Sequence, residues 1–183
     1  MTILHIDSSI SGAGSVSRTI SGAIVERLVR EEPDARIVRR DLVSEPLAHL
    51  TFDSFADSSV LDEFLAADTI VIGAPMYNFT LPTQLKAWLD RILIAGKTFR
   101  YTADGPEGLA GGRRVIVALA RGGMYGSGSP AAALEHLETY LRGVFNFIGI
   151  APEFLAADGL NISPEQRQES VKAALGETVR LAA

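Results

Sequence analysis

Cysteine is absent from the 183-residue chain, and histidine occurs only three times. The lack of thiols excludes disulfides, thiolate metal sites, iron–sulfur clusters and cysteine nucleophiles. The three histidines, His5, His49 and His136, lie far apart in the sequence, which argues against a histidine-based zinc centre. We therefore expect no metal site.

Positive charge is also scarce, because 17 Lys and Arg face 22 Asp and Glu, for a formal net charge of -5. A general nucleic-acid binder would need a surplus of cations to neutralise phosphates. Long apolar runs are missing, so no membrane span is predicted, and the first residues lack the basic and apolar segments of a signal peptide. We expect a cytoplasmic protein that binds neither nucleic acid nor membrane.

What is present is an ordinary globular composition, with 47% hydrophobic and 21% charged residues. Disorder and low-complexity fibres do not fit such a composition. Chains of ~100–200 residues usually build one hydrophobic core. A single domain over residues 1–183 is therefore expected.

Strand and helix patterns alternate five times along the chain. Apolar, β-rich runs predict strands at 3–9, 35–42, 69–75, 114–120 and 151–157. Helices are predicted from Arg18, at about 60–66, and from Pro82, Pro130 and Pro164; residues 44–59 and 96–112 are expected to be irregular. This order predicts an α/β three-layer sandwich: a five-stranded parallel sheet of flavodoxin-like order 2-1-3-4-5, with helices on both faces.

In such sheets ligands bind beyond the carboxyl ends of the strands, near the switch point between strands 1 and 3. The loop at residues 8–17 places serine hydroxyls and backbone N–H groups before a helix, as an anion site requires. It has no Walker lysine, and Ser17 stands where a Rossmann motif should have its third Gly or Ala. The loop thus favours a single terminal phosphate; the alternative is a solvated, well-capped turn.

The loops after strands 3 and 4 carry different chemistry. Residues 75–82 combine a thioether, two aromatic rings and an amide, which could flank a flat ring; ordinary packing at a strand end is the alternative. Gly122 and Gly123 leave backbone N–H groups exposed to a ring that becomes anionic on reduction, unless the loop is merely flexible. His5 and Trp88 are expected in the core, and His136 on the surface.

Longer motifs in these regions are more specific. They are Pro75-Met76-Tyr77-Asn78-Phe79 with Gln84-Leu85-Lys86, Ala95-Gly96-Lys97-Thr98-Phe99-Arg100-Tyr101-Thr102 with Gly105-Pro106-Glu107-Gly108-Leu109, Arg121-Gly122-Gly123, and Phe147-Ile148-Gly149-Ile150. In these motifs the chain resembles the FMN-dependent NADH-azoreductases, also described as NAD(P)H:quinone oxidoreductases. The resemblance extends over nearly the whole chain.

The resemblance implies a flavodoxin-like homodimer that binds FMN, with active sites built from both subunits. NADH would be the hydride donor, with NADPH left open, and quinones or azo compounds the acceptors. Carried over by position, the FMN contacts would be Ser9, Ser15, Val16 and Ser17 for the phosphate and ribityl chain, Met76, Tyr77, Asn78 and Phe79 for the ring, and Ala120, Arg121, Gly122 and Gly123 for its pyrimidine side. Tyr101 and Phe147 would wall the substrate pocket.

Three departures from the family pattern stand out. Ala120 replaces a serine that often precedes the Arg-Gly-Gly motif, Tyr125 stands where some relatives have histidine, and residues 44–66 form a shorter segment than usual. The short segment bears on substrate range and on dimer contacts.

The expected reaction is a ping-pong hydride transfer in which the cofactor carries the hydride, so no catalytic side chain is assigned. A flavodoxin-type electron carrier without turnover of its own is the alternative. A Rossmann-type NAD protein using Asp41 is weaker, because the third glycine is missing. A serine hydrolase is weaker still, because the chain has no G-x-S-x-G motif.

Overall fold

The computed structural model describes residues 1–181. Its central sheet contains five parallel strands in the order β2-β1-β3-β6-β7. The strands are β1 (Thr2–Asp7), β2 (Arg36–Asp41), β3 (Thr69–Pro75), β6 (Arg114–Ala120) and β7 (Glu153–Ala157). Counted within the sheet, this is the predicted order 2-1-3-4-5, so the predicted fold class is confirmed.

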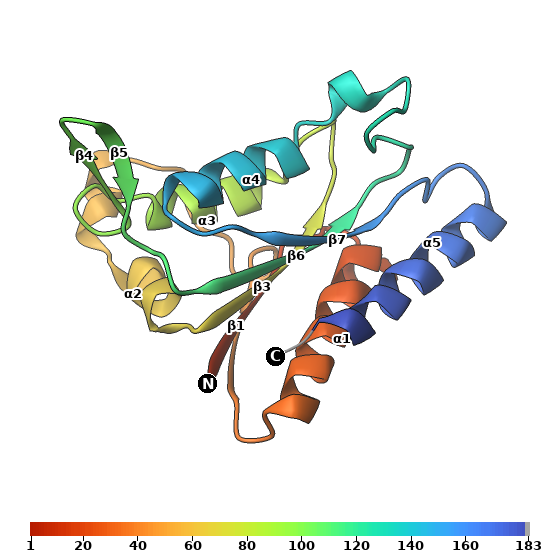
Figure 1. The fold of residues 1–183 in the computed structure, drawn as a ribbon, viewed down its shortest axis with the longest axis horizontal. Coiled ribbons are helices and arrows are strands. Elements are labelled where there is room, and N and C mark those ends of the chain that lie inside the picture. Colours follow the sequence, from red (N-terminus) through yellow and green to blue (C-terminus); the bar gives the residue numbers. More distant parts are fainter. Residues whose placement is uncertain (182–183) are drawn as a thin grey trace.

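Helices cover both faces of the sheet (Figure 1). On one face lie α1 (Val16–Glu31) and α5 (Pro164–Glu177), and on the other α2 (Ser59–Ala66), α3 (Thr83–Ile92) and α4 (Glu138–Phe147). Each face has its own apolar cluster, one holding Phe64, Trp88 and Phe145, the other Ile20 and Ile24. Strand β3 is buried at all seven positions, as a strand covered on both faces should be.

His5 and Trp88 are buried and His136 is exposed, as the sequence predicted. Nε2 of His5 lies 3.0 Å from the hydroxyl of Ser21 on α1. No helix within residues 1–181 is long and apolar enough to cross a membrane.

The predicted loop at 96–112 is wrong in part, because it contains an antiparallel hairpin of β4 (Phe99–Thr102) and β5 (Gly105–Gly108). The strands are only four residues long and mostly exposed, so they lack an alternating apolar pattern. Their pairing depends on cross-strand contacts, including an ion pair between Arg100 and Glu107 at 2.7 Å.

The predicted start of a helix at Pro130 is also wrong, because α4 begins at Glu138. The carboxylate of Glu135 accepts hydrogen bonds from the backbone N–H groups of Leu137, Glu138 and Thr139, at 3.0, 2.7 and 3.0 Å. These are the donors that a new helix leaves without partners. Only a short 3-10 turn (Ala132–Leu134) precedes this cap, and Leu134 within it is 44% exposed.

Candidate functional site

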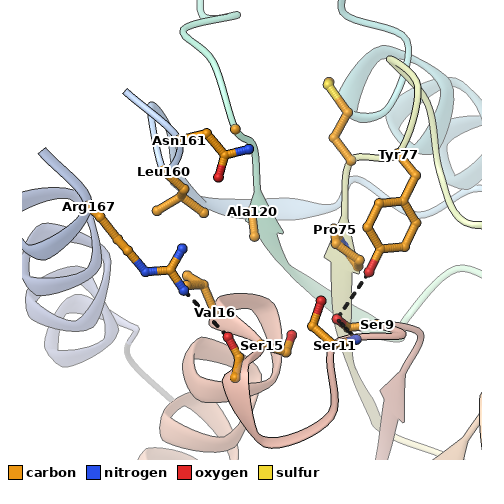
Figure 2. Close-up of a pocket in the computed structure, with 13 residues that line it drawn as sticks. Ser9, Ser11, Ser15, Val16, Pro75, Tyr77, Ala120, Leu160, Asn161 and Arg167 are labelled. Atoms are coloured by element: carbon orange, nitrogen blue, oxygen red, sulfur yellow. Dashed lines mark hydrogen bonds between the residues drawn. The ribbon is translucent and has the colours of Figure 1, made fainter. Parts of the chain in front are cut away.

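A cavity of about 180 Å³ opens at the carboxyl ends of β1, β3 and β6, at the predicted switch point (Figure 2). Three serines and a tyrosine give it a polar lower wall, and the loop after β7 closes the other side. The lining residues are Ser9, Ser11, Gly14, Ser15, Val16, Pro75, Met76, Tyr77, Ala120, Gly122, Leu160, Asn161 and Arg167.

The serine loop, residues 8–15, ends at the first turn of α1. The hydroxyl of Ser15 caps the helix by accepting from the Arg18 backbone N–H at 3.3 Å, and it lies 3.1 Å from the hydroxyl of Ser17. Within residues 1–181, no acceptor pairs with the backbone N–H groups of Val16 and Ser17. Free N–H groups at the positive end of a helix dipole form an anion site.

Two side chains hold the serine loop in place: Tyr77, which lines the cavity, and Arg18, which does not. The hydroxyl of Tyr77 accepts from the Ile10 backbone N–H at 3.1 Å and lies 3.2 Å from the Ser9 hydroxyl (Figure 2). The Arg18 guanidinium donates to the Ser9 carbonyl at 3.0 Å. The loop is therefore fixed before any ligand enters, which lowers the entropy cost of binding.

Arg18 also pairs with Asp41 through two hydrogen bonds of 2.8 Å. The hydrogen bond from Arg18 lowers the pKa of Asp41 to about 2. The carboxylate proposed for a Rossmann-type ribose contact is thus already used to brace the serine loop.

The turn after β3 has an unusual backbone. Asn78 and Phe79 both have positive φ, at 47° and 72°, between Tyr77 and Thr80, which pair with each other. Two consecutive positive φ values fit a type I′ turn, in which glycine is preferred at the second position. Phe79 is instead a bulky residue, 43% exposed, with its ring edge-on to Tyr125 at 6.2 Å. Strain of this kind is concentrated at functional sites.

In the turn after β6, as far as the structure describes the chain, the backbone carbonyls are hydrogen-bonded but the backbone N–H groups are not. The carbonyls of Gly122 and Gly123 accept from the N–H groups of Asn161 and Gly159, at 2.9 and 3.0 Å. Their own N–H groups have no acceptor within residues 1–181. A Cβ on Gly122 would lie 2.5 Å from Nδ2 of Asn161, so glycine is needed for this close approach.

Arg121 does not line the cavity, and its side chain is 4% exposed. Its guanidinium pairs with Asp158 at 2.6 Å, with Glu138 at 3.3 Å and with Glu135 at 3.5 Å. Burial opposes the charged form, but these carboxylates outweigh it and raise the pKa of Arg121. Arg121 therefore joins β6, the start of α4 and the loop after β7, and only its backbone is available to a ligand at the cavity.

The structure brings seven of the predicted cofactor residues together around the cavity: Ser9, Ser15, Val16, Met76, Tyr77, Ala120 and Gly122. Ser17 lies buried just behind Ser15, while Asn78, Phe79 and Gly123 flank the cavity without lining it. The roles of all these residues in cofactor binding stay predictions.

Sequence reasoning missed Leu160 and Asn161, from the loop after β7, and Arg167, from α5. The sequence motifs point only to the loops after strands 1, 3 and 4. The one available signal was position, since residues 158–162 follow the carboxyl end of the fifth strand, at the same edge of the sheet.

The two residues predicted to wall the substrate pocket do not line this cavity. Tyr101 is 75% exposed on the β4–β5 hairpin, which projects far from the start of α1 (Figure 1). Phe147 packs against Phe99, with ring centroids 4.7 Å apart, and borders an apolar surface groove with Leu93, Tyr140 and Val144.

The strand order and the polar cavity at its switch point define a protein of the flavodoxin class. In agreement, a family model described as "Flavodoxin-like fold" matches residues 1–181. The chain belongs to this family.

Curated relatives are similar over their full length. The chain is 55% identical to FMN-dependent NADH:quinone oxidoreductase 2 of Bradyrhizobium diazoefficiens and 52% identical to the FMN-dependent NADH:quinone oxidoreductase of Methylorubrum populi, covering 100% of both chains in each case. The first alignment spans 201 positions for a chain of 183 residues, so that relative carries extra residues.

Solved structures give the same result. An azoreductase from Bacillus anthracis str. Sterne superposes with a TM-score of 0.90 at 28% identity, covering 99% of this chain and 98% of that one. An FMN-dependent NADH-azoreductase from Bacillus anthracis str. Ames Ancestor, solved in complex with FMN, has a TM-score of 0.85 at 27% identity over 100% of both chains.

Proposed function

We propose that this protein is an FMN-dependent NADH:quinone oxidoreductase that also reduces azo compounds. The observation that carries the proposal is that two pairs of unpaired backbone N–H groups lie at one cavity: Val16, which lines it, with the adjacent Ser17, and Gly122, which lines it, with the adjacent Gly123. The first pair suits a phosphate, and the second suits the electron-rich rim of a flat ring. The names of the curated relatives support this combination.

The residues present fit FMN. The serine loop supplies hydroxyls and a helix N-terminus for the phosphate, and Met76, with the turn at Asn78 and Phe79, supplies thioether, amide and ring surfaces for a flavin. The cavity in one chain is smaller than the ~300–1,000 Å³ of usual cofactor sites. This cavity alone would therefore not enclose the whole cofactor.

When bound, FMN supplies a ring that accepts a hydride from NADH and passes it to a quinone or azo acceptor. The chain's own residues position that ring. The backbone N–H groups of Gly122 and Gly123 provide fixed dipoles for negative charge, and the bracing by Tyr77 and Arg18 means that the serine loop needs no reorganisation.

A visible spectrum of the purified protein tests the proposal. We expect flavin bands that disappear on anaerobic addition of NADH and return on addition of a quinone. Steady-state kinetics should give parallel double-reciprocal lines, because donor and acceptor use the same place in turn. A protein that cannot be loaded with FMN would contradict the proposal. FMN bands that NADH does not bleach would favour the electron-carrier alternative.

We further propose that the chain works as a homodimer in which Tyr101 and Phe147 of one subunit wall the cavity of the other. This is supported by the position of Tyr101, exposed on a hairpin far from its own serine loop, and by the apolar groove beside Phe147. Sedimentation should give twice the 19.6 kDa chain mass.

A mixing experiment tests the shared site. Tyr101→Ala removes the wall residue, and Gly122→Val obstructs the cofactor cavity. Each variant alone should be poorly active. Mixed dimers should regain activity, because one of their two sites is intact. Failure of mixed dimers to recover would contradict sharing across subunits.

A further inference from the structure

The side chain of Arg167 reaches the cavity from α5, a helix to which neither the sequence motifs nor the proposed function gives a role. Its Nη2 atom donates to the carbonyl of Gly14 in the serine loop, at 3.4 Å. Figure 2 shows the guanidinium extending from α5 toward Ser15 and Val16. A residue 153 positions away in sequence thus contacts the predicted phosphate loop.

Arg167 differs in charge balance from the other arginines around the site. Arg18 is paired with Asp41, and Arg121 with Asp158. The Arg167 side chain forms no ion pair with any carboxylate in the part of the chain that the structure describes, and the long bond to Gly14 is the sole hydrogen bond of its guanidinium there. A guanidinium has five N–H donors, arranged to hold two oxygens of one anion.

The serine loop has the complementary groups. The N–H groups of Val16 and Ser17 are unpaired, and the hydroxyls of Ser11 and Ser15 line the same cavity as Arg167. A helix N-terminus supplies only about half a positive charge, against the roughly −2 charge of a phosphate monoester. A half-buried cation beside the loop adds a full positive charge and charge-assisted hydrogen bonds.

We propose that Arg167 is a specificity residue that binds the terminal phosphate of the cofactor and selects FMN over riboflavin. This inference rests on the proposed function, since it concerns the same cavity. The competing explanation is that Arg167 only ties α5 to the serine loop, in which case it would support both flavins equally.

Comparing the two flavins separates these explanations. The full-length protein, stripped of flavin, is titrated with FMN and with riboflavin while the quenching of flavin fluorescence is followed. For Arg167→Gln we expect the Kd for FMN to rise about 10- to 100-fold, as loss of a hydrogen bond between charged groups implies. The Kd for riboflavin, which has no phosphate, should change less than about 2-fold.

Two further variants complete the design. Lys172→Gln is the matched control, because it removes an exposed positive charge from the same helix without touching the cavity, and it should leave both Kd values within about 2-fold. Arg167→Lys keeps the charge but loses the planar fork, so its FMN affinity should lie between those of wild type and Arg167→Gln. If Arg167→Gln does not fold, the loss in Arg167→Lys must still be confined to FMN.

The outcomes are distinct. Equal weakening of FMN and riboflavin, or no weakening of FMN, would overturn the role of Arg167 while leaving the proposed function standing. Failure of the wild-type protein to bind either flavin would overturn the proposed function itself, and this inference with it.

Discussion

At the scale of single residues, two positions near the cavity have unusual requirements. Gly122 lies in a close contact with another side chain, and Phe79 has a strained backbone conformation. Gly122 leaves room for Asn161 to pack over the turn after β6, whereas Phe79 keeps a large ring in a conformation that a side chain disfavours. Each therefore makes a specific prediction.

Gly122→Ala should weaken FMN binding with little loss of stability. The new Cβ would lie 2.5 Å from Nδ2 of Asn161, which is the far end of a side chain that can rotate away into the cavity. We expect the Kd for FMN to rise about 10-fold, by the ~1–3 kcal/mol that overpacking costs, while the melting temperature changes by only a few degrees. An unchanged Kd would show that Asn161 does not shape the cavity.

Phe79→Asn should separate stability from function. Asparagine tolerates positive φ far better than phenylalanine, so the backbone strain at φ 72° is relieved. Phe79 is 43% exposed and its ring lies edge-on to Tyr125, so the packing lost offsets only part of this relief. Urea denaturation should show a free energy of unfolding that is unchanged or up to ~1 kcal/mol higher, with weaker FMN binding. A clear loss of stability would mean that the ring serves the fold rather than the ligand.

At the scale of secondary-structure elements, glycine has opposite effects in helix α1 and in strand β3. Gly22 lies inside α1, where a Cβ would have no atom within 4 Å, whereas Gly73 in β3 faces Asp7, Ser21 and the backbone of Ser17. The first glycine weakens its helix, and the second allows α1 to pack closely on the sheet.

The two alanine substitutions should therefore differ in sign. Gly22→Ala should raise the free energy of unfolding by ~0.5–1 kcal/mol, since it removes the conformational freedom of a helix-interior glycine. Gly73→Ala should lower it by ~1–3 kcal/mol, because its Cβ would lie 2.6 Å from Oδ1 of Asp7. Urea denaturation of both variants provides the measurement, and a shift of the same sign in both would contradict this packing account.

At the scale of the whole molecule, Arg18 and Asp41 link α1, β2 and the serine loop, so their pairing should appear in acid stability. The pKa of Asp41 in the fold is about 2, below the ~3.9 of an unfolded chain. A lowered pKa contributes stability that is fully present above ~3.9 and is lost as the pH falls toward 2.

In Asp41→Asn this contribution is absent at every pH. The free energy of unfolding should therefore fall less steeply for the variant than for wild type between about pH 4 and pH 2, by a modest amount because the side chain is 36% exposed. Glu107→Gln is the control, since its pair with Arg100 is on the surface. Parallel curves for wild type and Asp41→Asn would contradict the assignment.

The sequence by itself determined the fold class, the strand order and three of the loops at the site. Buried parallel strands such as β3 are continuous apolar runs, and helices such as α3 have apolar residues every three or four positions. Both patterns involve only residues close together in the chain. The β4–β5 hairpin and the start of α4 were not predicted from the sequence, because they depend on contacts with Glu107 and Glu135 that no short sequence pattern encodes.

Only the tertiary structure decided which groups share the cavity. Asn161 and Arg167 reach it from the end of the chain, and Arg121, expected beside the cofactor, turned instead toward Asp158, Glu135 and Glu138. The physical reason is that a buried guanidinium must be paired with carboxylates, and the fold decides which carboxylates lie near it. Likewise, a backbone N–H group can be identified as unpaired only when the positions of all possible acceptors are known.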